Sequence, residues 1–329
     1  MSQDAAPDRA LDREALVEFA RISIRRGSKS FASASRLLRR EVRERVWMLY
    51  AWCRACDDLA DAQDHGGVLG DQSGGEARLG EIRRLTTMAL AGRATGHAAF
   101  DCLGVVAGEC GISAVHTSDV IAGFALDTSG WHPASEQDML AYCYHVAGAV
   151  GVLMALVMGV DREDGDTLNR ASDLGIAFQL GNIARDIAED HAAGRIYLPG
   201  DWLAEAGVAE ADLMRPEHRE ALVAMVAKLC AMAQRYEASA RVGAARLPLR
   251  SQWSVLAAAD IYGAIARKVA ARRAKAWDAR VSTSKSEKLG FLIEAGARAA
   301  GASWLGIVPG AVAEVPYARG VLAGAVERV

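Results

Sequence analysis

The stretch from Leu174 to Pro199, LGIAFQLGNIARDIAEDHAAGRIYLP, decides how the rest of the chain is interpreted. At about 100° per residue it predicts a helix whose polar residues share one stripe. The members of this stripe are Gly175, Gln179, Asn182, Asp186 and Asp190. Isoleucine and leucine cover the other sides, so we expect a buried helix. Because buried carboxylates are costly unless they are paired or bound to metal, the stripe predicts a cationic partner.

A solvated acidic surface is the alternative interpretation of the same stretch. Solvated faces interleave lysine and arginine with the acids, whereas here Ile183 and Ile187 interrupt them. Gly194 then ends the predicted helix, and Arg195 places a basic residue just beyond the acids. The pattern therefore favours a buried seam that binds charge.

A second acidic helix is predicted from Glu41 to Asp61, EVRERVWMLYAWCRACDDLAD. Its Asp57, Asp58 and Asp61 lie within about one turn, and Arg54 lies one turn earlier. The chain continues through residues 62–76, which are rich in glycine and aspartate. This stretch is either a mobile lid beside the acids or a plain surface connector.

Composition restricts the possible classes of protein. The chain has 329 residues, 51% of them hydrophobic and only 7 of them proline, which favours a large helical core. A net charge of −3 argues against a general nucleic-acid binder. The polar N-terminus has no apolar core of a secretory signal. The longest apolar run, 146–160, is too short for the roughly 20 residues of a membrane span.

The six cysteines are scattered, and no second pair matches Cys53 and Cys56 at the spacing of a zinc site. We therefore expect small, buried, reduced thiols. Small residues at Ala147, Gly148 and Gly151 predict either tight helix packing or close approach of an apolar ligand.

The whole chain reads as all-α, because no segment alternates with the period of a strand. Helices are expected at 13–26, 31–39, 41–61, 77–92, 98–110, 115–128, 136–159, 164–192, 217–246 and 250–279. We expect one domain over residues 13–295, with a flexible N-terminus at 1–12. The structure of the tail at 296–329 is not predicted.

Two carboxylate clusters on buried helices, each near arginine, are what a magnesium–diphosphate site requires. Mg²⁺ prefers oxygen ligands and is usually held by one or two carboxylates together with phosphate oxygens. An apolar cavity beside such a site would hold a hydrocarbon and protect a carbocation from water. No Gly-x-x-x-x-Gly-Lys-Ser/Thr or Gly-x-Gly-x-x-Gly motif and no Glu-x-x-His pair supports another phosphate or metal chemistry.

Four segments together resemble the signature of the squalene/phytoene synthase family. They are SKSF (28–31), LYAWCRACDDLAD (49–61), YCYHVAG (142–148) and FQLGNIARDIAEDHAAGRIYLP (178–199). LPLRSQW (247–253) and AWDARVSTSKSEKL (276–289) resemble more narrowly the bacterial phytoene synthases within that family. The resemblance implies the isoprenoid (terpenoid) synthase helical bundle with a central apolar cavity.

The resemblance also implies a reaction. Two geranylgeranyl diphosphates would be joined head to head through prephytoene diphosphate to give phytoene and two diphosphates, the first committed step of carotenoid biosynthesis. Mg²⁺ or Mn²⁺ ions bridging the diphosphates would be needed, and NADPH would not.

Site residues are implied by the same resemblance. The catalytic set is Tyr50, Arg54, Asp57, Asp61, Tyr142, Asp186, Asp190 and Tyr262. The substrate-binding set is Ser30, Phe31, Ser35, Arg54, Gln179, Asn182, Arg185 and Arg195. The metal-binding set is Asp57, Asp58, Asp61, Asn182, Asp186, Glu189 and Asp190.

Three alternatives stay open. A squalene or dehydrosqualene synthase acting on farnesyl diphosphate would share every motif. A head-to-tail prenyltransferase is more distant, because its acid motifs are typically Asp-Asp-x-x-Asp and Asp186 has no aspartate next to it. A non-catalytic helical scaffold would keep the fold and need no metal.

The resemblance and composition also predict where the protein acts and with what. We expect prenyl diphosphates as partners and no nucleic acid. The expected location is the cytoplasm, with peripheral association at the inner face of the membrane and contact with later carotenoid enzymes.

Overall fold

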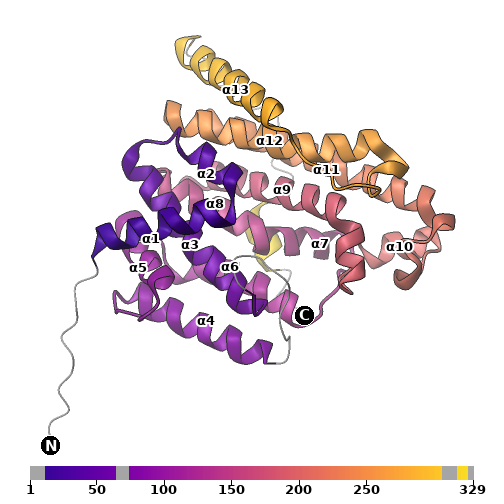
Figure 1. Ribbon diagram of the computed structural model, residues 1–329, viewed down its shortest axis with the longest axis horizontal. Helices are drawn as coiled ribbons and strands as arrows, with labels where there is room; N and C mark the ends of the chain where they lie inside the picture. Colours follow the sequence, from indigo (N-terminus) through magenta and orange to yellow (C-terminus); the bar gives the residue numbers. More distant parts are fainter. Residues whose placement is uncertain (1–11, 64–73, 306–316, 325–329) are drawn as a thin grey trace, which may run out of the picture. The chain divides into compact units, whose positions relative to one another are not determined.

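The computed structural model describes residues 12–63, 74–305 and 317–324, without the side chains of residues 29, 30 and 302–305. Helices are its only regular elements within these ranges (Figure 1), which confirms the all-α prediction. Residues 1–11 and most of the glycine-rich stretch 62–76 lie outside the described residues. The helices form two compact units, one up to Ser129 and one from Gly130, and each is described by itself. The expectation of a single domain over 13–295 stays a prediction.

The first unit is organised around its third helix. Its elements are α1 (Arg13–Gly27), α2 (Lys29–Ser35), α3 (Arg40–Ala60), α4 (Gly75–Leu90), α5 (Ala98–Cys110) and α6 (Ala114–Thr128). Helix α3 packs against α1, α4, α5 and α6, and it buries Val46, Met48 and Trp52 completely. Arg13 at the start of α1 pairs with Glu44 of α3 at 2.8 Å and Glu109 of α5 at 2.7 Å. These contacts fix the helix that carries the first acidic motif.

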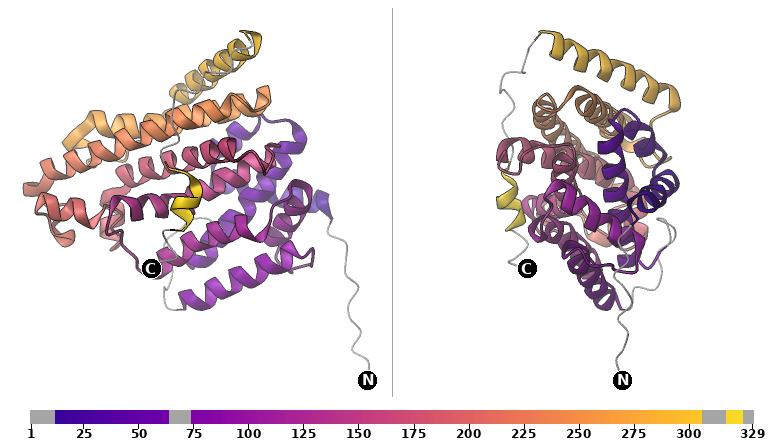
Figure 2. Two further views of the ribbon diagram at one scale, coloured as in Figure 1. Left: turned by 180° about the vertical axis from the view of Figure 1, so that it is seen from behind. Right: turned by 90° about the vertical axis from the view of Figure 1, so that its left-hand side faces the viewer.

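The second unit is organised around α9, which packs on its neighbours α7, α8, α11 and α12 (Figure 2). Its elements are α7 (Glu136–Cys143), the π-helical turn η1 (Tyr144–Gly148), α8 (Ala149–Val157), α9 (Gly165–Ala192), α10 (Gly200–Ala206), η2 (Glu210–Asp212), η3 (Pro216–His218), α11 (Arg219–Ala244), α12 (Leu249–Arg272), η4 (Arg273–Lys275), α13 (Lys285–Leu305) and α14 (Arg319–Ala323). On α9, Ile176, Leu180, Ile183 and Ile187 are all at most 5% exposed. The buried helix predicted from its sequence is confirmed.

Small residues bring α9 against η1 and α8 at backbone distance. A Cβ added to Gly175 would lie 2.1 Å from the carbonyl oxygen of Ala147, and one on Gly151 would lie 2.3 Å from that of Ala171. The interpretation of this segment as tight packing is confirmed. The run Glu136–Val157 is long and apolar enough for a membrane span, but 72% of its most apolar window is buried inside the structure. It is a core segment here.

One predicted helix end in the second unit is wrong, and two of its helices were not predicted. Helix α12 ends at Arg272 instead of 279, because Arg273 adopts a positive φ of 51°. Helices α10 and α13 were not predicted. Helix α13 lacks a clear buried apolar face, because part of its apolar surface faces solvent: Leu289 is 59% exposed and Ile293 is 64% exposed.

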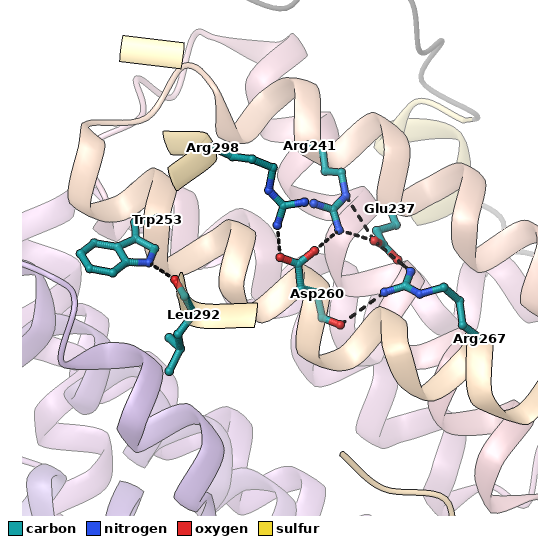
Figure 3. Close-up of polar contacts among 7 residues, drawn as sticks. All are labelled: Glu237, Arg241, Trp253, Asp260, Arg267, Leu292 and Arg298. Carbon is teal, nitrogen blue, oxygen red and sulfur yellow. Dashed lines mark hydrogen bonds and ion pairs between the residues drawn. The ribbon is translucent and has the colours of Figure 1, made fainter. Parts of the chain in front are cut away.

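Polar contacts hold α13 in place (Figure 3). The indole N–H of Trp253 on α12 donates to the carbonyl of Leu292 at 2.7 Å. Arg298 of α13 pairs with the buried Asp260, which also accepts from Arg241 of α11 at 2.7 Å. One buried carboxylate thereby joins three helices, a link that no local sequence pattern reveals.

Candidate active site

The C-terminal end of α3 collects the first group of site residues. Asp57 and Asp58 lie in its last turn, and Asp61 is the residue that caps it. Arg54 forms an ion pair with Asp57 and lies 3.9 Å from Asp58. Burial alone would lower the pKa of Arg54, but Asp57, Tyr50 and Asp58 together raise it. The guanidinium therefore stays protonated beside the acids.

Tyr50 lies one turn before Arg54 and is packed on two sides. Its ring centroid is 5.7 Å from that of Phe31 on α2. On the other side, a Cβ at Gly27 would lie 2.2 Å from the Tyr50 hydroxyl oxygen, so only glycine fits there. Burial raises the pKa of Tyr50, while Arg54 opposes this rise. Tyr50 is therefore a neutral phenol at physiological pH.

Ser30 and Ser35 complete the predicted residues of α2. The side chain of Ser30 lies outside the described residues, so its predicted role stays a prediction. Ser35 is 1% exposed, and its hydroxyl accepts from the indole N–H of Trp47 at 2.9 Å. The structure therefore shows Ser35 engaged with α3, and its predicted contact with a substrate is untested.

The C-terminal half of α9 collects the second group. The side chain of Arg185 pairs with Asp186, with 2.7 Å from Nε to Oδ1. Burial would lower the pKa of Arg185, but Asp186 raises it. One turn earlier, Asn182 donates to the side-chain oxygen of Gln179 at 3.4 Å. The predicted polar stripe is thus present as a half-buried row on a buried helix.

Arg280 is a site residue that the sequence analysis missed. It follows α12 by eight residues, yet its guanidinium lies 2.9 Å from Asp186 and 2.9 Å from Glu189. Arg280 belongs to the segment AWDARVSTSKSEKL, which was noted only for its resemblance. The cation expected beside the acidic stripe is therefore supplied twice, by Arg185 and by Arg280.

The end of α9 and the segment after it surround a small cavity. The backbone N–H of Arg195 donates to the Asp190 carbonyl at 2.9 Å. Asp190, Arg195 and Tyr197 line the cavity together with Ile183 and Ile187, and its volume of about 10 Å³ matches one water molecule. Asp190 and Arg195, both predicted site residues, thus line the same small cavity next to apolar side chains.

The predicted tyrosines of the second unit lie in aromatic stacks. Tyr142, 3% exposed, is stacked between Trp131 and Tyr197, with centroids 5.7 and 4.8 Å away. Tyr262 stacks on Phe178 of α9 with centroids 4.5 Å apart. Offset stacks of this kind fix ring orientation and add about 0.5–1.5 kcal/mol beyond the area they bury.

Comparisons with known proteins show which family the chain belongs to. The squalene/phytoene synthase family model matches residues 24–287. A 15-cis-phytoene synthase from Enterobacter agglomerans is 45% identical over 280 residues, which cover 83% of this chain and 92% of that protein. The chain belongs to the squalene/phytoene synthase family. A phytoene synthase from Rhodobacter capsulatus is 35% identical and spans 90% of this chain and 85% of its own length.

Solved structures of the squalene/phytoene synthase family share the fold. A dehydrosqualene synthase in complex with ligand matches with a TM-score of 0.78 at 25% identity, over 88% of this chain and 98% of its own. A squalene synthase from Alicyclobacillus acidocaldarius matches with a TM-score of 0.70 at 25% identity, over 81% of this chain and 96% of its own. The predicted isoprenoid synthase fold and prenyltransferase class are confirmed.

The described residues contain no preformed cluster of metal-ligand side chains. Among the residues that the structure describes, no three His, Cys, Asp or Glu side chains are grouped to hold an ion. All six cysteines are free thiols, and burial raises the pKa of Cys53 to about 12. Four of the cysteines are buried as expected, whereas Cys53 and Cys110 are only partly buried. The expected metal ligands stay a prediction.

Proposed function

We propose that this enzyme joins two geranylgeranyl diphosphates head to head, through prephytoene diphosphate, to give phytoene and two diphosphates. The supporting observation is the similarity to four curated phytoene synthases, which are 42–45% identical over 82–85% of this chain. The dehydrosqualene and squalene synthase structures reach 25% identity. The relationship therefore favours the phytoene reaction over the squalene reactions.

The acidic side chains suit Mg²⁺ or Mn²⁺, which take carboxylate oxygens. Such ions need only one or two protein carboxylates when water and phosphate oxygens complete the coordination shell. A preformed cluster of three protein ligands is therefore not required. We propose Asp57 and Asp61 on α3, and Asp186 and Asp190 on α9, as the ligands. When bound, the ions would screen the diphosphate charge and stabilise the diphosphate as it leaves.

The arginines of each unit would act on the diphosphate oxygens. Arg54 and Arg185 are part-buried at 23% and 15% side-chain exposure, and each is held by a neighbouring aspartate. Charge-assisted hydrogen bonds from guanidinium groups are roughly twice as strong as neutral ones. Because both side chains are already fixed, little conformational entropy is lost when a diphosphate binds.

The stacked rings of Phe178 and Tyr262 would stabilise the carbocation intermediate. An aromatic face attracts a cation by about 0.5–1 kcal/mol when exposed and about 2 kcal/mol when desolvated. Both rings belong to the same unit as Asp186, and the stack orients them. This assignment rests on the reaction class and on the geometry of the stack.

One product analysis tests the reaction. The protein is incubated with Mg²⁺ and either fifteen- or twenty-carbon prenyl diphosphate, with and without NADPH, and the products are identified by mass spectrometry. A forty-carbon product from the twenty-carbon substrate without NADPH is expected. A thirty-carbon product as the main outcome would assign the enzyme to the squalene or dehydrosqualene reaction, and no product would support a non-catalytic scaffold.

Peripheral contact with a membrane and with later carotenoid enzymes is also proposed. An apolar product has to leave the protein for an apolar phase, and α13 exposes Leu289 and Ile293 one turn apart. Co-sedimentation with anionic vesicles, compared between the natural chain and Ile293→Glu, tests the membrane contact. Equal sedimentation of the two proteins would rule out this face.

A further inference from the structure

The segment that carries Arg280, residues 276–284, follows a fixed course although it contains no helix. Ala276 and Val281 are each 1% exposed. The indole N–H of Trp277 donates to the Ala184 carbonyl at 3.1 Å. Ala184 directly precedes Arg185 on α9, so this bond ties the segment to the turn that presents the acids.

Basic side chains from α12 hold the same segment on both sides of Arg280. Arg272 donates to the Ala279 carbonyl at 3.3 Å, and Lys268 donates to the Ser282 carbonyl at 2.8 Å. Lys268 also pairs with Glu287 at the start of α13, 2.7 Å away. The backbone next to Arg280 is thus fixed from α9 and from α12.

The ion pairs of Arg280 do not account for its position by themselves. Its side chain is 55% exposed, and that of Glu189 is 52% exposed. Exposed ion pairs contribute only about 0–1 kcal/mol, because they are screened and cost side-chain entropy. The pair with Asp186, whose side chain is 17% exposed, holds the guanidinium at one end, and the anchored backbone restrains the residue at the other.

We propose that Trp277 and Lys268 are positioning residues that hold Arg280 beside Asp186 and Glu189, ready for a diphosphate. This inference rests on the proposed function, because it needs a diphosphate as the ligand of Arg280. The guanidinium of Arg219 lies over the Trp277 ring, 5.6 Å from its centroid, and keeps the indole in place from the other side. Preorganisation of this kind improves binding by removing the cost of ordering the side chain.

A matched pair of variants separates positioning from stability. Trp277→Phe removes an indole N–H that donates to the carbonyl of Ala184. Trp253→Phe removes one that donates to the carbonyl of Leu292 (Figure 3). Only the first bond lies beside the acids of α9. The affinity for inorganic pyrophosphate with Mg²⁺ is measured by calorimetry, together with melting temperature and with KM and kcat.

The expected result is a difference between the two variants. Trp277→Phe should weaken pyrophosphate binding about tenfold, whereas Trp253→Phe should change it by less than about twofold, although both lose a comparable hydrogen bond. Lys268→Met, which alters no buried residue, should also weaken binding and thus tests the idea even if Trp277→Phe folds poorly. Equal affinities for the Trp277→Phe, Trp253→Phe and Lys268→Met proteins would overturn the proposal.

A double-mutant cycle tests whether the effect passes through Arg280. If it does, Trp277→Phe should have no further effect on pyrophosphate affinity when Arg280→Gln is already present. Additive losses would show that Trp277 acts by another route and would overturn the proposal. If the wild-type protein makes phytoene and Trp277→Phe binds pyrophosphate with wild-type affinity, only this inference is refuted. A natural chain that neither binds pyrophosphate nor makes product refutes the proposed function as well.

Discussion

The hydroxyl of Ser35 accepts the indole N–H of Trp47 at 2.9 Å and donates to the Ala32 carbonyl at 2.9 Å. A member of the predicted substrate-binding set thus also closes the contact between α2 and α3. Its replacement therefore has two separable effects, one on volume and one on hydrogen bonding.

Ser35→Phe is predicted to shift substrate preference from the twenty- toward the fifteen-carbon diphosphate, on the hypothesis that Ser35 lines the cavity for the prenyl tail and that a phenyl ring would shorten it. Overpacking a buried site costs about 1–3 kcal/mol, and Trp47 would lose its acceptor. Competition between the two substrates and melting temperature are measured together. Ser35→Ala is the control, since it removes the acceptor without adding volume. A folded Ser35→Phe protein with the natural substrate ratio would show that Ser35 does not line the pocket.

Asp186→Asn is predicted to leave the protein folded and to reduce turnover by orders of magnitude. The change removes a charge that Arg185 and Arg280 now neutralise, and it weakens a proposed metal ligand. Initial rates are measured as a function of Mg²⁺ concentration. Asp166→Asn, near the start of the same helix, is the control, because its partners are the structural Arg170 and Arg246. If Asp186→Asn turned over at the wild-type rate with an unchanged magnesium requirement, the assignment of Asp186 as a metal ligand would be wrong.

Arg54→Lys is predicted to lose most of the activity although the charge is kept. The planar guanidinium can bind two oxygens at once, which an ammonium group cannot. Arg45→Lys on the same helix is the matched control, because Arg45 forms its ion pair with Glu109, at 2.7 Å, and not with an acid of the proposed site. KM and kcat are compared for the two variants. If Arg54→Lys resembled Arg45→Lys, the role of Arg54 would be structural.

Asp173 gives the protein a predicted dependence on pH. It is 1% exposed, and its carboxylate accepts from the Ser239 hydroxyl at 2.5 Å. Burial raises its pKa from 3.8 to about 7. Because the folded state binds this proton more tightly than the unfolded chain, the stabilisation is complete below about pH 4 and is lost as pH rises through about 7.

The size of the effect can be checked with one variant. A pKa rise of about three corresponds to roughly 4 kcal/mol at most. Melting temperatures of the natural chain and of Asp173→Asn are compared between about pH 5 and pH 8. The natural chain should lose more stability than the variant over this range. Parallel curves for the two proteins would show that Asp173 is not protonated in the folded state.

The parts of the fold that were predictable are those in which one helix carries its own pattern. The stripe of α9 and the row from Tyr50 to Asp57 on α3 follow from helical periodicity, because residues three and four apart share a face. Their ion pairs with Arg185 and Arg54 lie within one turn. Such local arrangements need no knowledge of the rest of the chain.

What could not be predicted depends on contacts across long stretches of sequence. Arg280 lies 2.9 Å from Asp186 in a segment whose Trp277 is bonded to Ala184, 93 residues earlier. Likewise, α13 is held by Trp253 and Asp260, whose partners lie 39 and 38 residues away. No periodicity within a helix encodes such pairings. The sequence indicated Trp253, Trp277 and Arg280 only through the resemblance of their segments to a family, and it did not indicate Asp260.

The backbone crossing at Gly151 and Gly175 sets a boundary for re-engineering this enzyme. A methyl group at either position would fall 2.1–2.3 Å from a carbonyl oxygen of the neighbouring segment, so α9 itself would have to move. Any such movement would carry Phe178 and Asp186 with it and would disturb ring stack and acids together. Mutant libraries that aim to change the length of the prenyl substrate should therefore keep both glycines and vary the surrounding side chains, where each change can be selected independently.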